Sequence, residues 1–127
     1  MVASQTKVVA FGGGHGLAAT LTALRDVTPN ITAVVTVADN GGSSGKIRSE
    51  FNFLPPGDLR MALAALCGAD SWGQSWAETI QHRFTSEGEL NGHALGNLLL
   101  AALWDSSDDL VAGIDRVGEL LKIIEFG

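Results

Sequence analysis

The chain is poor in the residues that mark secreted, membrane-spanning or nucleic-acid-binding proteins. Among 127 residues it has one cysteine and no tyrosine, and Lys and Arg together number 8. With Cys67 alone, no disulfide can form within the chain, which fits a reducing cytoplasm. Residues 1–7 lack an apolar signal core, and the longest apolar stretch, 98–104, is too short to span a bilayer. We therefore expect a cytoplasmic protein without a membrane span.

Positive charge is scarce as well, and its distribution is informative. The net charge is −6, and no basic stripe is present, which argues against nucleic acid as a partner. Residues 1–70 hold as many acidic as basic side chains, so the whole acidic excess falls within residues 71–127. The glycine-rich loops of the first half therefore need not repel an anionic ligand. Apolar residues make up 46% of the chain, which is typical of a folded domain rather than a disordered one.

The pattern of apolar residues predicts an α/β fold. Residues 7–11 read as a strand, residues 17–26 as a helix with leucines at helical spacing, and the β-branched run 32–37 as a second, buried strand. Such a βαβ unit, spanning residues 7–60 with the loops that follow it, has a right-handed crossover. The long segment 38–57 reads as a loop without regular structure. Its glycine and serine content alone would permit a flexible linker, but Phe51, Phe53 and Leu54 favour a folded, packed loop.

Helices are expected in the remainder, so residues 61–122 read as mostly helical. One would begin after Asp58 as its N-cap and cover residues 59–68, and a second carries Trp76, Ile80 and Phe84 at a spacing of four. A third would start within residues 91–97, and a fourth would follow the caps and acids of residues 106–109.

Only two strands are clear, with residues 123–126 as a candidate third. The sequence thus predicts a Rossmann-like parallel sheet that is incomplete, followed by a helical segment. Residues 1–127 then read as the N-terminal part of a single, larger domain. An open sheet edge pairs with other chains, so we expect the chain alone to aggregate or to form a partly ordered oligomer.

Two glycine-rich segments follow the two strands and are candidates for an anion site. Gly12, Gly13, Gly14, His15 and Gly16 stand where a helix begins, and glycines there allow a ligand phosphate to approach the backbone amides. The alternative is a tight strand-to-helix turn without a ligand, since the full dinucleotide fingerprint is absent. No arrangement of His, Cys or acidic residues has the spacing of a metal site.

The second segment offers more kinds of ligand-binding group. Asp39 and Asn40 end the strand, Gly41, Gly42, Ser43 and Ser44 suit an anion-binding nest, and Lys46 and Arg48 suit phosphate. The alternatives are an Asx turn for Asp39 and Asn40, and solvated positions for the two cations.

Two further segments complete the set of candidates. Asp58 suits a helix N-cap, whereas Arg60 in the first turn opposes the helix dipole unless an acid or a ligand phosphate compensates it. His93 and Asn97 lie about one helical turn apart and are candidate ligand contacts, although a histidine there is often only a satisfied capping group. No serine-histidine-acid signature or nucleophile elbow is present.

Four runs occur in one order along the chain: Gly12–Leu17, Asp39–Gly45, Pro55–Arg60 and Gly92–Asn97. Together they resemble the gluconeogenesis factor family of bacteria, which is related to the 2-phospho-L-lactate transferases of coenzyme F420 synthesis. The resemblance covers nearly all of residues 7–121. It implies a Rossmann-like sheet with an added helical part, and a UDP-sugar ligand such as UDP-N-acetylglucosamine. It also implies a cytoplasmic regulator of cell shape and cell-wall precursor metabolism, present here as an N-terminal fragment.

The leading interpretation is a non-enzymatic regulator that requires no cofactor, with a cell-wall enzyme and further copies of itself as candidate partners. The alternative is a phosphotransferase like the 2-phospho-L-lactate transferases, with Asp39 holding Mg²⁺; a non-functional remnant is a third reading. The transferases usually carry two adjacent acids, and Asn40 here cannot supply the second carboxylate. Lys46 stands where the gluconeogenesis factor family often has Arg. An ammonium point charge therefore replaces a guanidinium, which can bind a phosphate through two hydrogen bonds.

Overall fold

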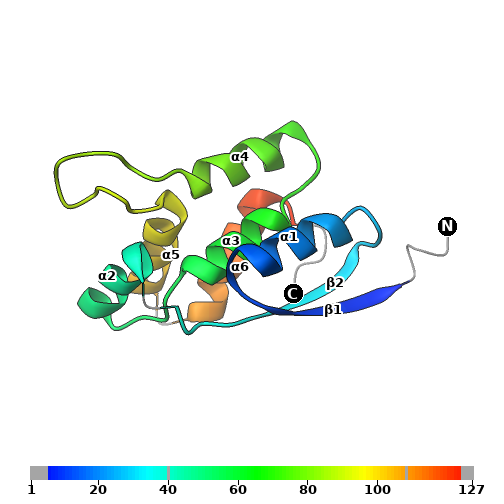
Figure 1. Cartoon of the computed structure of the whole chain (residues 1–127), viewed down its shortest axis with the longest axis horizontal. Helices are drawn as coiled ribbons and strands as arrows, with labels where there is room; N and C mark the ends of the chain where they lie inside the picture. The colour runs from blue at the N-terminus through cyan, green and yellow to red at the C-terminus, as the bar shows by residue number, and fades with distance from the viewer. Residues whose placement is uncertain (1–5, 40, 108, 124–127) are drawn as a thin grey trace.

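The computed structural model describes residues 6–39, 41–107 and 109–123, and within them two parallel strands are followed by helices. Strand β1 (Lys7–Gly12) pairs with β2 (Asn30–Val35) in a register that runs from Lys7 opposite Asn30 to Gly12 opposite Val35. Helix α1 (Gly14–Leu24) makes the crossover between them. The sheet and α1 form one end of the molecule, and the other helices form the opposite end (Figure 1). The predicted α/β class with an incomplete sheet is therefore confirmed.

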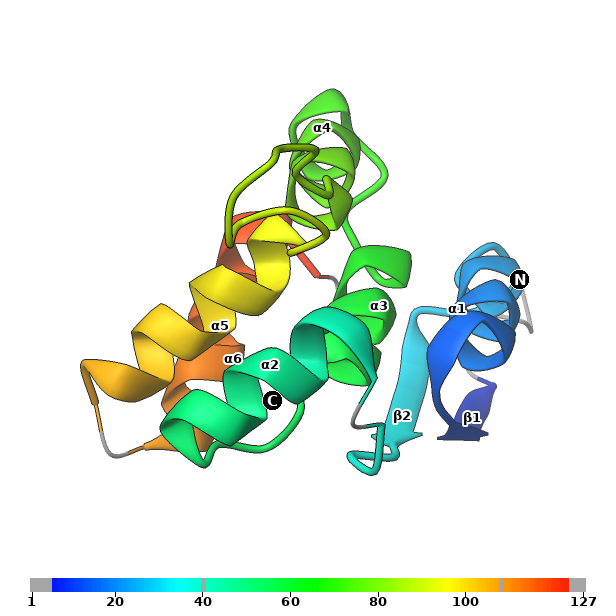
Figure 2. The same ribbon diagram turned by 60° about the vertical axis from the view of Figure 1, so that its left-hand side comes forward.

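Two hydrophobic clusters make up the core, and one helix contributes to both. The first cluster joins the sheet to α1 through Ala10, Leu17 and Leu21. The second lies among the helices around Ile80, Leu100, Trp104, Val117 and Leu121. Helix α3 (Gly57–Ala65) supplies Ala62 to the first cluster and Leu63 and Ala64 to the second. Figure 2 shows α3 between the sheet with α1 on one side and the remaining helices on the other.

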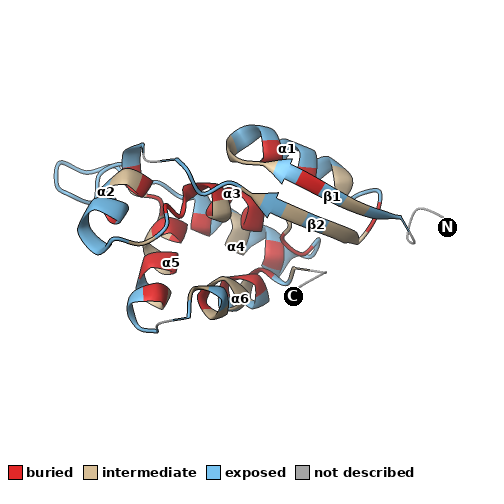
Figure 3. Cartoon of the chain, turned by 90° about the horizontal axis from the view of Figure 1, so that it is seen from below, coloured by how far each residue is buried: buried red, intermediate tan, exposed pale blue. Residues whose placement is uncertain are grey.

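The sheet has one uncovered face. Side chains alternate along each strand, so Ala10 points into the core while its neighbours Val9 and Phe11 point away from it. Phe11 is 75% exposed, and Val34 on the paired strand is also exposed. Figure 3 shows exposed positions along both strands, with one buried position in β1 and intermediate positions in β2. The association expected from the open sheet edge stays a prediction, and this exposed apolar face would contribute to it.

The segment predicted as a loop contains a helix, and this is the main correction to the sequence-based fold. Helix α2 (Gly42–Phe51) occupies half of residues 38–57 and ends at Asn52, whose φ of 57° is left-handed. Its glycines and serines lower helix propensity and conceal it in the sequence. Burial of Ile47, Ser43 and Ser44 against the rest of the molecule outweighs that propensity.

The structure also corrects several predicted ends of helices and strands. Helix α1 begins at Gly14 rather than residue 17, and β2 covers residues 30–35 rather than 32–37. Helix α4 (Ser71–Gln81) ends before Phe84, and α5 (Leu95–Asp105) begins after His93. Helix α6 (Leu110–Leu121) has Asp109 as its predicted N-cap, accepting from the amide of Ala112 at 3.1 Å. The candidate third strand, 123–126, lies outside the described residues apart from Ile123, which is not in a strand.

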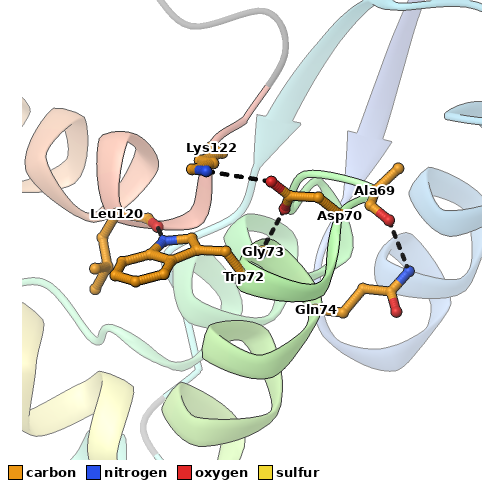
Figure 4. A network of polar contacts seen from close by, with 7 residues as sticks. All are labelled: Ala69, Asp70, Trp72, Gly73, Gln74, Leu120 and Lys122. Carbon is orange, nitrogen blue, oxygen red and sulfur yellow. Dashed lines mark hydrogen bonds and ion pairs between the residues drawn. The ribbon is translucent and has the colours of Figure 1, made fainter.

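The start of α4 is fastened to the end of α6 by a small polar network (Figure 4). The Asp70 carboxylate accepts the Gly73 amide at 2.8 Å, as an N-cap, and pairs with Lys122 Nζ at 3.2 Å. The Trp72 indole donates to the carbonyl of Leu120 at 2.8 Å, and Lys122 Nζ lies 5.6 Å from the Trp72 ring centroid. The Gly73 amide, and secondarily Lys122, lower the pKa of Asp70 below its ordinary value.

This network generates a prediction about stability and pH. Because the folded-state pKa of Asp70 is lowered, its contribution is present above pH 3.8 and is lost as the pH falls through the folded pKa. We expect Asp70→Ala to lower the melting temperature at pH 7 more than Asp70→Asn, since asparagine keeps the cap but not the ion pair. Circular dichroism melts of the three proteins measure this. The gap between wild type and Asp70→Asn should shrink as the pH falls below 3.8, and a gap that is constant with pH would contradict the assignment.

Candidate functional site

Three helices begin close together at the edge of the sheet where both strands end. Helix α1 follows β1, α2 follows β2, and two contacts tie their first turns to the start of α3. The Gly14 amide donates to Asp58 Oδ1 at 3.1 Å, and the Gly57 amide donates to Ser44 Oγ at 2.9 Å. Ligands of open α/β sheets bind beyond this edge, and helix N-termini carry partial positive charge. The arrangement therefore suits an anionic ligand.

Asp58 holds the first glycine turn against the second strand. Its Oδ2 accepts from the Thr36 hydroxyl at 2.9 Å, so the carboxylate joins α1, α3 and the residue after β2. A Cβ on Gly13 would lie 2.3 Å from Thr36 Oγ1 and 2.5 Å from Asp58 Oδ2, so glycine is required there. The predicted N-cap role of Asp58 is wrong, because the residue lies inside α3 and makes no capping bond to that helix.

The rest of the first glycine turn faces outward. His15 and Gly16 are exposed, and no atom lies within 4 Å of a Cβ built on Gly16. Gly12 and Gly14 adopt positive φ values of 146° and 62°, which permit the sharp change from strand to helix. The expected tight turn is therefore present, with open space beside the first amides of α1.

The second glycine segment divides into outward and inward residues. Asp39 is exposed, and its Oδ1 accepts from the Gly41 amide at 2.9 Å, which is the Asx-turn geometry considered as the alternative. Gly42 begins α2 with a φ of 51° and open space around its Cβ position, whereas Ser43 and Ser44 are buried. Asn40 lies outside the described residues. The anion-binding nest expected from Gly41 to Gly45 is a helix N-terminus instead.

The two cations of α2 lie farther along the helix. Lys46 is exposed one turn after Gly42, and Arg48 lies in the last turn, beside a hollow of about 270 Å³ that Asn52 and Leu110 also line. At about 1.5 Å per residue, Arg48 is displaced along the helix from its N-terminus. The structure therefore places Lys46 nearer than Arg48 to the expected anion site.

Arg60, Asn97, Ser43 and His93 form a chain of hydrogen bonds that links four segments. Arg60 Nη1 donates to Asn97 Oδ1 at 2.9 Å, and Asn97 Nδ2 donates to Ser43 Oγ at 3.1 Å. Ser43 Oγ lies 2.7 Å from His93 Nδ1. The structure thus brings together residues that the sequence placed up to 54 positions apart.

Arg60 is the most buried cation of this region, with only 4% of its surface exposed. Its Nε donates to Gln81 Oε1 at 2.6 Å, so both of its partners, Gln81 and Asn97, are neutral amides. Burial and the nearby charge of Arg83 lower the pKa of Arg60 to about 10, while Asp58 raises it. The side chain stays charged at neutral pH, and within the protein the two amides hold its guanidinium.

Sequence reasoning missed two residues of this site, Thr36 and Gln81, and it expected a close approach at Gly96 without identifying Arg60 as the neighbour. A Cβ on Gly96 would lie 2.7 Å from Arg60 Cγ and 2.8 Å from the Ile80 carbonyl oxygen, so Gly96 makes room for the guanidinium arm. The spacing of Gly92 and Gly96, four residues apart, predicts a shared helix face that allows a close approach, but Gly92 lies before α5. Nothing in the local pattern identifies Thr36 or Gln81, because both act across elements.

Two absences can be stated for the described residues. No group of three or more His, Cys, Asp or Glu side chains is placed to hold a metal ion there. No helix in that part of the chain is long and apolar enough to cross a membrane.

A protein-family comparison matches residues 8–125 to the model described as 2-phospho-L-lactate transferase CofD. A protein of Mycobacterium leprae named "Putative gluconeogenesis factor" is 55% identical over 120 residues, which cover 94% of this chain and 33% of that protein. The protein of Bacillus subtilis named "Gluconeogenesis factor" is 42% identical over 117 residues, covering 92% of this chain and 36% of its own length. The chain spans about a third of these relatives.

A solved structure agrees with the fold. A crystal structure of a Bacillus halodurans protein superposes with a TM-score of 0.85 at 42% identity, covering 95% of this chain and 38% of that one. The strands, the glycine turns and the helices described above are thus shared with a longer protein.

A pair of glycine substitutions tests the packing around Arg60. We expect Gly96→Ala to destabilise the protein by about 1–3 kcal/mol, because the new methyl group meets the Arg60 arm and a backbone oxygen. Gly16→Ala is the matched control, since it adds a methyl group in a helix where no atom lies within 4 Å. It should stabilise the protein by up to about 1 kcal/mol through helix propensity. Urea unfolding measures both, and equal effects of the two changes would contradict the close packing.

Proposed function

The chain belongs to the family described as 2-phospho-L-lactate transferase CofD, and we propose that it is a cytoplasmic regulator that binds a nucleotide sugar of the UDP-N-acetylglucosamine type. Its similarity to proteins named gluconeogenesis factor supports a role outside catalysis. Because the chain spans about a third of those relatives, the activity and partners of the whole protein are part of the proposal. The regulated process would be cell shape and the supply of cell-wall precursors.

The observation that carries the proposal is the convergence of three helix N-termini at the edge of the sheet. Buried Asp58 bonds one amide, that of Gly14, which leaves the neighbouring amides of His15 and Gly16 at an exposed helix start. Gly41 and Gly42 offer a second exposed start with open space for a close approach. Two adjacent anion-favouring positions suit the two phosphates of a nucleoside diphosphate sugar.

The polar side chains around these turns suit the uncharged parts of such a ligand. Asp39 is exposed at the end of the second strand segment, where its second carboxylate oxygen can accept from a ribose or sugar hydroxyl. His93 is half-buried beside Ser43, at the start of α2. Lys46 supplies a positive charge one turn further on. These residues would surround a diphosphate with hydroxyl-binding groups on one side.

The second candidate function is a phosphotransferase, and the family description favours it. It would require Mg²⁺ next to Asp39, with a second hard oxygen ligand. The sequence offers Asn40 at the adjacent position, and the Asp58 carboxylate is already occupied by Gly14 and Thr36. We therefore rank transfer below binding and regulation.

Isothermal titration tests the ligand class. We expect UDP-N-acetylglucosamine to bind the protein, and Asp39→Asn to weaken binding by about tenfold, or about 1.4 kcal/mol. Asparagine keeps the bond to the Gly41 amide but removes the carboxylate, so the loop conformation is preserved. Asp26→Asn is the matched control, because it removes the same charge at an exposed position after α1.

Two outcomes would contradict the proposal. Binding of guanine nucleotides alone, with Mg²⁺-dependent transfer of a phosphorylated lactyl group, would favour the transferase. Equal affinities of Asp39→Asn and Asp26→Asn for the UDP-sugar would remove Asp39 from the site.

A further inference from the structure

The chain of hydrogen bonds from Arg60 to His93 has a direction, and Arg60 determines it. A guanidinium carries only donors, so the Asn97 atom that faces Arg60 at 2.9 Å must be the amide oxygen. The Asn97 amide nitrogen must then face Ser43, to which it donates at 3.1 Å. The orientation of this amide therefore follows from the chemistry of the neighbouring cation.

The direction continues through Ser43 to the imidazole. The Ser43 oxygen has two acceptor lone pairs and accepts from Asn97, so the direction of its other contact depends on its single hydroxyl hydrogen. Ser43 is buried, and His93 Nδ1 at 2.7 Å is the one acceptor that the described residues offer to this hydrogen. Because a buried hydroxyl hydrogen needs an acceptor, the hydroxyl donates to this nitrogen. A nitrogen that accepts carries no proton, and the neutral ring then holds its proton on Nε2.

We propose that Arg60, through Asn97 and Ser43, holds His93 as the neutral Nε2–H tautomer, so that His93 presents a hydrogen-bond donor to an oxygen of the bound ligand. The tautomer follows from the four side chains alone. The ligand contact rests on the proposed function, and the acceptor would be a phosphate or sugar oxygen of the nucleotide sugar. Arg60, Asn97 and Ser43 are positioning residues in this scheme, because they act through His93.

His93 is placed to make such a contact. It is half-buried, and no described residue makes a hydrogen bond to its Nε2. Its backbone is fixed on both sides, because its carbonyl accepts from Phe84 at 2.9 Å and its amide donates to Leu90 at 3.0 Å. Arg83 also braces the turn by donating to the carbonyl of Gly92 at 2.8 Å. The ring is therefore held next to the exposed start of α2 with one donor still available.

Asn97→Asp tests the direction of these hydrogen bonds, because aspartate has nearly the same shape as asparagine. A carboxylate still accepts from Arg60 but cannot donate to Ser43, so the Ser43 hydroxyl should turn toward residue 97. His93 Nδ1 would then carry a proton, and in the neutral ring, which buffers well above pH 7 favour, Nε2 carries none. Asn91→Asp is the matched control, because it adds the same charge two residues from His93 and keeps its role as an acceptor from the Ser86 amide.

Long-range ¹H–¹⁵N NMR correlations report which ring nitrogen is protonated. The protein has 3 histidines, and loss of one ring signal in a His93→Gln variant assigns the resonances. An unconstrained imidazole also favours the Nε2–H form in water, so the decisive comparison is between the variants. We expect Nε2–H in the wild type and in Asn91→Asp, and a protonated Nδ1 in Asn97→Asp. An unprotonated Nδ1 in Asn97→Asp would overturn the proposed direction, whatever the ligand is.

Titration with UDP-N-acetylglucosamine tests the contact separately. Asn97→Asp should weaken binding about tenfold or more relative to Asn91→Asp, since it costs one hydrogen bond to the ligand. If Asn97→Asp does not fold, His93→Ala and His93→Gln replace it, because glutamine keeps an amide donor near the Nε2 position. His93→Gln should then retain most of the affinity that His93→Ala loses.

The outcomes separate this inference from the proposed function. If the wild type does not bind the UDP-sugar, the proposed function fails and the ligand contact fails with it, while NMR still decides the tautomer. If the wild type binds and the two Asn→Asp variants bind equally, the donor role of His93 is overturned. Equal affinities of His93→Ala and His93→Gln for the UDP-sugar would also overturn the donor role of His93.

Discussion

The first turn of α3 carries a buried carboxylate and a buried guanidinium, and the structure depends on where these two groups point. Asp58 and Arg60 are two residues apart on a helix, which places them on opposite faces about 200° apart. Asp58 reaches toward the sheet and bonds the first amide of α1, whereas Arg60 reaches toward α4 and α5. Removing either partner would leave a buried polar group unsatisfied on one side of α3. One helical turn therefore connects the strand end of the molecule to its helical end.

The glycines of the four motifs have two different roles that the sequence does not distinguish. Gly13, Gly57 and Gly96 leave room for Asp58 or Thr36, for Ser44 and for Arg60, respectively, so they serve internal packing. Gly16, Gly42 and Gly92 have no atom near their Cβ positions, and they leave space outside the protein. In the proposed function, the open backbone at Gly16 and Gly42 would be accessible to the ligand. The glycines of these motifs thus include some that packing requires and some that it does not.

Much of the fold follows from the sequence, because the two strands, the crossover and the α6 cap depend on local patterns. The sequence missed α2, since its glycines and serines resemble a loop and its stability comes from Ile47 and the two buried serines. The sequence predicted that Asp58 caps the helix that follows it. Its actual partner, the Gly14 amide, is 44 residues away in the sequence, and no local pattern reveals that the two lie side by side. The sequence required an acid or a ligand phosphate to compensate Arg60; the acid Asp58 raises the pKa of Arg60, and the neutral amides of Gln81 and Asn97 accept its hydrogen bonds. The missed features are all long-range, and single-residue patterns do not report them.

The segment between α4 and α5 is closed at its base. An antiparallel bridge joins Arg83 to Ala94, and backbone bonds pair Phe84 with both Gly92 and His93, while residues 85–91 are exposed beyond them. Residues 87–89 can therefore vary in composition without moving the imidazole, because the contacts that hold its backbone are made by Phe84 and Leu90. A peptide tag or a reporter domain placed at Gly88 would report on this region while leaving the hydrogen-bond chain intact.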